Sequence, residues 1–287
     1  MGNETPAPER RMDVANLAPG LVVVAGDWHG NRHWSVNIVE RLPELLPDER
    51  PRVVVHCGDF GIWSNQAGQD YLSHLSRALR AVDAYLFFVD GNHEDHTLLR
   101  KFAATSPVGA PVQVTTRIWW LPRGFRWTWW GNSWLALGGA VSVDRVFRTA
   151  GVDWWPEEEI SDADVAAAAY GGPVDVMVCH DRPSCAPLAL ARPPTSWRQC
   201  DLRRSDLHRQ RLQAVVDHVK PRLLVHGHYH CDDDTVVPVP WGELRVTGIG
   251  MDGGPRPNVR VLNTRSLAWV PRGGRGTTTG PSLARLM

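Results

Sequence analysis

Short apolar runs alternate with longer amphipathic stretches along most of the chain. The runs are bounded by polar or glycine-containing segments and have the length of buried β-strands. They span residues 21–25, 52–57, 85–89, 174–179 and 222–225. The stretches with helical spacing of apolar residues span 33–46, 66–82, 94–104, 156–169 and 205–219. Strands that alternate with helices in this way predict a largely parallel sheet with helices on its faces.

Two further regions are rich in residues that favour strands. Residues 112–139 hold six tryptophans and glycine-containing turns, which predicts a β-meander with most of its indoles in the core. Residues 235–270 also have the pattern of strands, so we expect two sheets packed together and flanked by helices. The polar start, 1–18, and the Gly-, Thr- and Arg-rich end, 271–287, predict a flexible arm and a flexible tail around one domain at 19–270.

Composition narrows the class of protein. The chain has 287 residues, of which 43% are hydrophobic, and its 31 Lys plus Arg balance its 31 Asp plus Glu. A neutral chain has no overall field to attract a polyanion, which argues against a general nucleic-acid coat protein. Five scattered cysteines, no signal-peptide pattern and no apolar run of membrane-spanning length predict a soluble cytoplasmic protein. The mixed charged run at 201–211 is expected to be a solvated helix face.

Metal-capable side chains follow each of the five predicted strands. The segments are Gly26-Asp27-Trp28-His29-Gly30, Gly58-Asp59, Gly91-Asn92-His93-Glu94, His180, and His226-Gly227-His228-Tyr229-His230. In open α/β sheets, binding sites form at the carboxyl ends of the strands. Carboxylates, imidazoles and an amide oxygen suit divalent first-row metals. Two such ions about 3.5–4 Å apart can bind a phosphate and ionise water, so the sequence predicts a two-metal site for phosphoester chemistry.

The ordered series D-x-H, G-D, G-N-H-E, H and G-H-x-H, between residues 26 and 230, resembles the signature of the calcineurin-like metallophosphoesterase superfamily. This resemblance implies an α/β fold, a four-layer sandwich of two mixed β-sheets flanked by helices. It implies that one metal is held by Asp27, His29 and His230, that the second is held by Asn92, His180 and His228, and that Asp59 bridges both. His93 would act at the leaving-group oxygen as a general acid or charge stabiliser. The expected cofactors are two divalent ions, Mn²⁺ first, with Fe, Zn, Co or Ni as alternatives.

The chain departs from the branch of this superfamily that contains the phosphoprotein phosphatases. Ile62 stands where that branch has an aspartate that orients the catalytic histidine. Trp63 and Asp90 stand where it has two phosphate-binding arginines. The orienting partner of His93 is therefore open, with Asp90 and Asp95 as candidates by sequence proximity.

Several other residues are candidates for substrate binding. Arg145 and Arg148 lie in a charged segment after a predicted strand. They could clamp a phosphate, because a guanidinium matches phosphate oxygens bidentately, and a solvated loop is the alternative interpretation. His96 could reach the substrate, and Trp28 or Trp63 could stack on a base or form a wall of the pocket.

The reaction expected from these features is hydrolysis of a phosphoester by attack of a metal-bound hydroxide. We favour a phosphodiester in a small nucleotide or at a nucleic-acid end, because the arginines that would neutralise a monoester dianion are missing and the aromatic surroundings suit a nucleobase. The alternatives are a phosphomonoesterase, a DNA or RNA nuclease, and a metal-bearing binding protein that has lost turnover. No membrane partner is expected, and nucleic acid is expected only as a substrate.

Overall fold

The computed structural model describes residues 12–188, 196–254 and 258–271. Its strands form two six-stranded sheets. The first has the order β12 (Val259–Asn263), β1 (Leu21–Ala25), β2 (Arg52–His56), β3 (Ala84–Phe88), β5 (Ile118–Trp120), β4 (Val112–Gln113). The second has the order β10 (Asp233–Val239), β11 (Gly242–Gly248), β9 (Leu223–His226), β8 (Val176–Cys179), β7 (Asn132–Leu137), β6 (Arg126–Trp129). In each sheet the four central strands are parallel and the edge strands are antiparallel, which confirms the expected mixed sheets.

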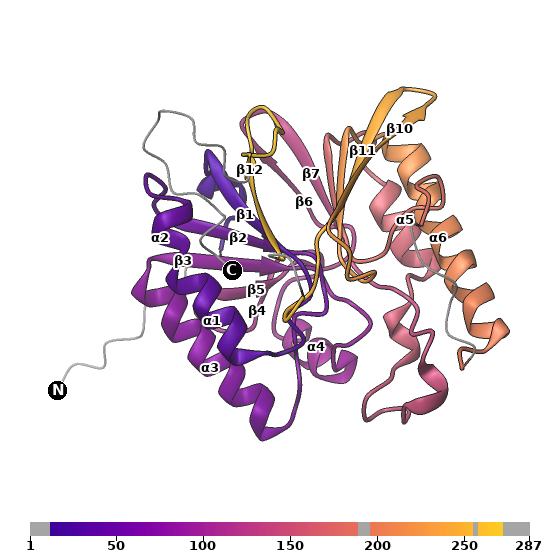
Figure 1. The fold of residues 1–287 in the computed structure, drawn as a ribbon, viewed down its shortest axis with the longest axis horizontal. Helices are drawn as coiled ribbons and strands as arrows, with labels where there is room; N and C mark the ends of the chain where they lie inside the picture. The colour runs from indigo at the N-terminus through magenta and orange to yellow at the C-terminus, as the bar shows by residue number, and fades with distance from the viewer. Residues whose placement is uncertain (1–11, 189–195, 255–257, 272–287) are drawn as a thin grey trace.

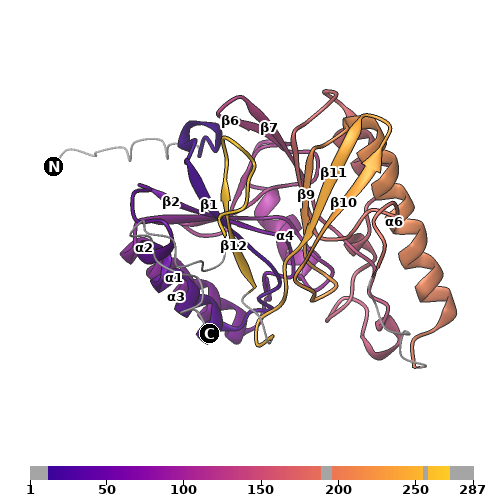
Figure 2. The same ribbon diagram turned by 45° about the horizontal axis from the view of Figure 1, so that its top comes forward.

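Helices cover the outer face of each sheet (Figure 1). The first sheet is covered by α1 (Arg32–Glu40), α2 (Leu42–Leu45), α3 (Gln66–Ala81) and α4 (His96–Ala103). The second is covered by α5 (Asp162–Ala169) and α6 (Gln199–Val219), and α6 runs along its outer side (Figure 2). Short 3-10 turns lie at Ala15–Leu17, Arg145–Phe147 and Pro156–Glu158. No helix in the described part of the chain has the length and apolar character to cross a membrane.

Alternating side chains of the parallel strands build the layers. In β1, Val22 and Val24 belong to the core between the two sheets, whereas Val23 belongs to the core under α1–α4. Successive side chains of a strand face opposite sides, so a valine-rich run buries both of its faces. A third core lies between the second sheet and its helices, where Val216 of α6 and Leu224 of β9 share a cluster. Helices, sheet, sheet and helices therefore form the four layers that the resemblance implied.

Local capping accounts for helix boundaries that differ from the predicted ones. The predicted helix 33–46 is divided into α1 and α2 just before Pro43, which has no N–H to continue the helical hydrogen bonds. The predicted helix 156–169 starts only after Ser161, whose hydroxyl caps α5. Asp95 caps α4 in the same way, so α4 begins at residue 96 rather than 94. Conversely, α6 begins before the predicted position, at residue 199.

The predicted β-meander at 112–139 is wrong in its connectivity. β4 and β5 belong to the first sheet, and β6 and β7 belong to the second. The tryptophans of the second pair lie between the sheets, where the ring centroids of Trp127 and Trp134 are 5.4 Å apart and those of Trp129 and Trp134 are 5.1 Å apart. The local pattern shows that strands form here, but their sheet is decided by burial of these indoles against strands distant in sequence.

The predicted N-terminal arm, 1–18, is packed in its described part. Val14 is 1% exposed and belongs to the core between the sheets. Trp129 donates its indole N–H to the carbonyl of Val14 at 2.8 Å. This part of the chain therefore belongs to the folded body and is not a loose arm. Residues 1–11 and 272–287, which make up the rest of the predicted arm and tail, lie outside the described residues.

Replacing Trp134 with alanine should lower the free energy of unfolding by about 3–5 kcal/mol, because it removes a buried indole from between the sheets and leaves a cavity. Urea unfolding followed by circular dichroism measures the change. Trp130→Ala is the matched control, since Trp130 is 47% exposed and should cost about 1 kcal/mol or less. Equal losses in the two variants would contradict the placement of Trp134 in the core between the sheets.

Candidate metal centre

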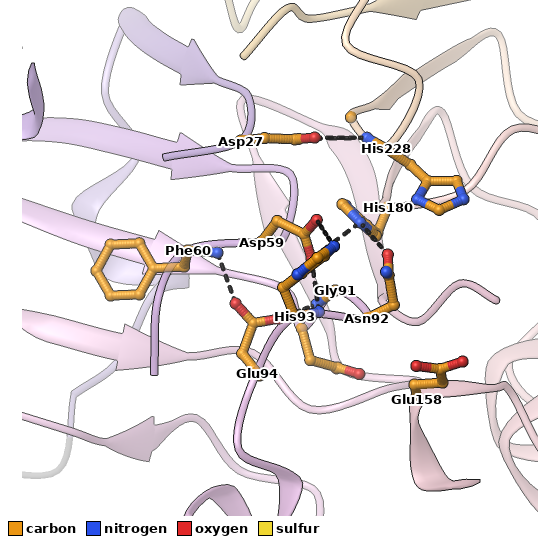
Figure 3. Close-up of polar contacts among 12 residues, drawn as sticks. Asp27, Asp59, Phe60, Gly91, Asn92, His93, Glu94, Glu158, His180 and His228 are labelled. Carbon is orange, nitrogen blue, oxygen red and sulfur yellow. Dashed lines mark hydrogen bonds and ion pairs between the residues drawn. The ribbon is translucent and has the colours of Figure 1, made fainter. Parts of the chain in front are cut away.

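The carboxyl ends of the central strands of both sheets meet at one edge of the sandwich. In the first sheet, β1, β2 and β3 lead into Asp27, Asp59 and Asn92. In the second sheet, β8 leads into His180 and β9 leads into the segment 227–230. Figure 3 shows the side chains from the two sheets converging. The fold therefore brings together the five strand-end segments that the sequence pattern singles out.

One group of potential ligands comes from both sheets. Its members are Asp27, His29, Asp59 and His230, and one ligand atom from each lies within 4.8 Å of all the others. Nε2 of His230 is 3.2 Å from Oδ2 of Asp27, and Nε2 of His29 is 3.5 Å from Oδ2 of Asp59. Two carboxylates and two imidazoles are a donor set that divalent first-row metals accept.

The other oxygen of Asp59 faces a second group. Its Oδ1 is 3.2 Å from Nε2 of His180, and the same nitrogen is 3.1 Å from Oδ1 of Asn92. The ring of His228 lies beside that of His180, with their centroids 5.1 Å apart. The backbone N–H of His228 donates to Asp27 at 3.0 Å, which ties the second group to the first. Asp59 therefore stands between the two groups, as a bridging ligand must.

The backbone of this edge is strained at the candidate ligands. Nine non-glycine residues in the described part have a positive φ, and four of them are His29 (46°), Asp59 (50°), His228 (63°) and His230 (53°). This left-handed region is unfavourable for residues with a Cβ, and residues held in it are concentrated at functional sites. Gly91 also shows the crowding, because a Cβ at this position would lie 2.2 Å from Oδ1 of Asp59.

The buried carboxylates at this edge need positively charged partners. Asp27 and Asp59 are buried, and within 4.0 Å all their ion pairs in the described part of the chain are with histidines. Burial lowers the pKa of His29, but its bonds to Asp252 and Asp59 outweigh burial and raise the pKa to about 11. Burial is likewise outweighed at His180, where Asp59 raises the pKa to about 10. Protons on these rings thus balance the carboxylates in the ion-free protein, and a divalent ion satisfies the same need.

Glu94 holds two of the loops in register. Its buried carboxylate accepts the backbone N–H groups of Phe60 at 2.6 Å, Gly61 at 3.2 Å and Gly91 at 2.5 Å. These residues lie directly beside Asp59 and Asn92, so one side chain fixes the loops that follow β2 and β3 (Figure 3). Burial and the charge of Asp59 raise the pKa of Glu94 to about 8.

The structure adds a carboxylate that sequence analysis missed. Asp252 follows β11 and lies 2.8 Å from Nδ1 of His29. A histidine whose Nδ1 donates to a carboxylate keeps Nε2 free as a ligand atom, and in His29 it is Nε2 that faces Asp59. The pattern used for the other strand ends did not mark it, because β11 is a mixed polar strand and Asp252 lies four residues beyond its end.

Asn92 is oriented by two other residues that sequence analysis missed. Its amide nitrogen donates to Oγ of Ser142 at 3.1 Å, and that hydroxyl donates to the buried carboxylate of Glu158 at 2.6 Å. Because the hydroxyl hydrogen is used on Glu158, Oγ of Ser142 can only accept from Asn92. The amide oxygen of Asn92 is therefore the atom that faces His180.

Asp181 connects the His228–His230 segment to α6. Its carboxylate accepts from the hydroxyl of Tyr229 at 2.8 Å and lies 2.6 Å from Nδ1 of His208. Nε2 of His208 accepts the backbone N–H of Ile160, so Nδ1 carries the proton and donates to Asp181. His208 and Arg209 are buried, so the prediction of a solvated helix face at 201–211 is wrong for this side of α6.

His93 lies beside the ligand groups, with Nε2 3.8 Å from Oδ2 of Asp59. Its partner is Arg148, whose Nη1 and Nη2 lie 3.0 and 2.8 Å from Nδ1 and Nε2 of His93. A neutral imidazole has one acceptor nitrogen, so only one of these contacts is a hydrogen bond at a time. Asp144 in turn binds Arg148 with both carboxylate oxygens. Burial is the main factor that lowers the pKa of His93. The charge of Asp59 acts in the opposite direction, and Arg148 lowers the pKa further.

The two carboxylates suggested by sequence proximity do not orient His93. Asp90 forms an ion pair with Arg123 at 2.6 Å, and Asp95 caps α4. Asp90 therefore joins two segments of the fold, and Asp95 stabilises the start of a helix. Arg148, which contacts the imidazole of His93, lies 55 residues away in sequence. From the sequence, it was assigned to phosphate binding.

Three predicted substrate-binding residues lie elsewhere. Trp28 is fully buried in the core under α1–α4, so it cannot stack on a substrate. His96 is 5% exposed and its Nε2 lies 3.2 Å from the carbonyl oxygen of Gly91, so it supports a loop. Arg145 forms an ion pair with Asp201 at 2.7 Å. Of the predicted arginines, only Arg148 is beside the candidate ligands.

A cavity of about 690 Å³ opens against the ligand groups, and we call it the α6 cavity. Its wall at the candidate metal centre is made by Asp59, Asn92, His93, His228 and His230. Its other wall includes Val143, Asp144, Trp197, Leu202, Asp206 and Tyr229. No arginine or lysine is among the described residues that line it. The cavity gives a substrate access to both ligand groups.

Comparisons with known proteins agree with this site. The family model described as calcineurin-like phosphoesterase matches residues 20–232. Among solved structures, the chain is similar in fold to TT1561 of Thermus thermophilus, with a TM-score of 0.53 and 11% identity over 88% of this chain and 97% of that one. A search of curated proteins gave no match. Because the family match covers most of the chain and every candidate metal ligand, the chain belongs to the calcineurin-like phosphoesterase family and is a metal-dependent phosphoesterase.

Proposed function

We propose that the protein hydrolyses phosphodiesters, in a small nucleotide or at a nucleic-acid end, with two divalent ions. In this proposal one ion is held by Asp27, His29 and His230, the other by Asn92, His180 and His228, with Asp59 between them. When bound, such ions offer positive charge to the phosphate oxygens and ionise an attacking water. Mn²⁺ is our first choice, with Fe, Zn, Co or Ni as alternatives, because mixed oxygen and nitrogen ligands accept them all. We propose a cytoplasmic location, which the five free cysteines favour.

The charge of the α6 cavity is the observation that carries the diester proposal. Besides the candidate ligands, its described lining holds Asp144 and Asp206 and no arginine or lysine. Arg148 is nearby, but both oxygens of Asp144 bind it. A monoester dianion brings one more negative charge than a diester and would face these carboxylates without a free basic partner. A diester also has a second organic arm, for which Trp197 and Leu202 provide an apolar wall.

We propose that His93 stabilises the leaving-group oxygen by a hydrogen bond. The lowered pKa of His93 favours a neutral imidazole, which still has one N–H to donate. Arg148 has no acceptor, so the ring nitrogen that it bonds must be the unprotonated one, and the other nitrogen carries the hydrogen. That second nitrogen also lies within 3.0 Å of Arg148, so the ring turns away from the guanidinium when it donates to the leaving group. Arg148 thus takes the orienting role that a carboxylate has in the related branch. Of the two roles expected for His93, this supports charge stabiliser over general acid.

The proposed function is tested with bis(p-nitrophenyl) phosphate and p-nitrophenyl phosphate under the same metal. We expect the diester to have the higher kcat/KM, because it needs less compensating charge. Asp59→Asn should abolish hydrolysis of both esters and lower the metal content, which would assign the activity to this site. Faster turnover of the monoester would favour the phosphomonoesterase alternative. No hydrolysis of either ester with any of the named metals would favour a binding protein.

Replacing Arg148 with alanine should lower kcat/KM for the diester by about 10- to 100-fold, the loss typical of a hydrogen bond to a charged group. Metal content, measured by elemental analysis, should not change. Arg145→Ala is the matched control, because Arg145 lies in the same segment but pairs with Asp201. We therefore expect Arg145→Ala to keep the activity of the wild type. Similar losses in both variants would show that the segment matters only for its fold.

Metal affinity should fall as the pH is lowered from about 8 to about 6, by about tenfold per pH unit for each proton displaced. The pKa values of about 11 for His29 and about 10 for His180 place protons on both rings in the ion-free protein. A ligating imidazole must be neutral, so binding releases these protons and acid favours the metal-free form. Titration calorimetry in buffers of different ionisation enthalpy measures both affinity and proton release. An affinity that is independent of pH would contradict ligation by these rings.

A further inference from the structure

A second cavity, of about 400 Å³, opens on another side of the candidate ligands. We call it the Trp63 cavity, and it is lined by His29, Trp63, Asn65, Tyr71, Val152 and Asp153, among others. It shares no lining residue with the α6 cavity. The ring of His29 lies beside two further rings, with its centroid 5.5 Å from that of His93 and 5.2 Å from that of His230. Both of those rings line the α6 cavity, so the candidate metal centre lies between two cavities.

One segment of the chain forms a wall of both cavities. Val143 and Asp144 line the α6 cavity, and Val152 and Asp153 line the Trp63 cavity. Between these two pairs, Arg148 contacts His93 and donates to the carbonyl of Asp153 at 3.3 Å. The segment therefore forms a wall of both cavities and lies against His93 between them.

The chemistry of the Trp63 cavity suits an uncharged aromatic group. The indole of Trp63 is partly exposed, and its ring centroid lies 6.4 Å from that of Trp155. Val152 is 67% exposed and adds an apolar surface. No arginine or lysine is among the described residues that line the cavity, and Asp153 is acidic, so the cavity is not suited to a second phosphate. The α6 cavity is similar in kind, with partly exposed Trp197 as its aromatic residue.

We propose that the Trp63 cavity binds the second organic arm of the diester while the α6 cavity binds the first. The substrate class is then a diester with an aromatic base on each side of a single phosphate, as in a dinucleoside monophosphate. This inference rests on the proposed phosphodiesterase function and adds to it a requirement for two arms. Stacking of a base on an aromatic side chain is tolerant of sequence, so two aromatic walls would accept different bases.

The test uses bis(p-nitrophenyl) phosphate, which has two aromatic arms, and methyl p-nitrophenyl phosphate, which has one and carries the same charge. Trp63→Ala and Trp197→Ala should each lower kcat/KM for the two-armed ester by about tenfold, the scale of one lost aromatic stack. The one-armed ester should lose activity in only one of these two variants. Trp130→Ala, which removes a half-exposed indole that lines neither cavity, is the matched control and should match the wild type.

Val152→Glu provides a second variant that does not disturb packing, because this side chain is two-thirds exposed. It places a carboxylate in the Trp63 cavity and should lower kcat/KM for the two-armed ester as Trp63→Ala does. Metal content is measured for every variant, since His29 lines this cavity.

The outcomes separate the inference from the function on which it rests. If the wild type hydrolyses the two-armed ester, but Trp63→Ala and Val152→Glu both match it, the second subsite is wrong and the diesterase proposal stands. Losses of equal size for both esters in both tryptophan variants would assign the indoles a purely structural role and also overturn the subsite. If the wild type hydrolyses no diester, the proposed function fails and the subsite fails with it.

Discussion

The charge of Asp59 is the constraint on which the rest of this structure depends. Its carboxylate is buried between the two sheets, with one oxygen toward His29 and the other toward His180. A buried carboxylate without a basic partner costs several kcal/mol, and in the described chain only imidazoles are within reach. The two sheets must therefore stay in a fixed relation that keeps these imidazoles around this charge. Sheet packing and metal binding are thereby coupled.

A fixed relation between the sheets also allows strain at the ligands. His29, Asp59, His228 and His230 have left-handed backbones, and each such residue costs of the order of 1–3 kcal/mol. Such conformations persist only where the surroundings determine them. Here the strands just before them are buried on both faces, and the loops between them are held by backbone bonds to side chains such as Glu94. The rigid core thus offsets the cost of presenting several donors to one point.

The sequence predicts what is local and misses what is not. The strand-end motifs, and from them the residues that the fold brings to one edge, could be predicted because each motif is contiguous. Asp252 and Glu158 could not be assigned to His29 and Ser142–Asn92, because these contacts join positions up to 223 residues apart. The sheet of β6 and β7 was missed for the same reason. Trp28 was a different kind of error, since a residue next to a ligand on an extended segment faces the opposite side, which here is the core.

The balance of formal charge connects the candidate metal centre to the choice of substrate. In the proposed two-ion site, the ions would carry four positive charges and Asp27 and Asp59 would offset two of them, so two would remain. A diester anion and one hydroxide are enough to use up what remains. A monoester dianion would leave the site negative unless a basic residue joined it. The arginine beside the site, Arg148, is already bonded by both carboxylate oxygens of Asp144. It therefore orients His93 more than it adds positive charge. In the proposed site, this balance would favour a singly charged phosphate and leave recognition of the rest of the substrate to the apolar walls on either side.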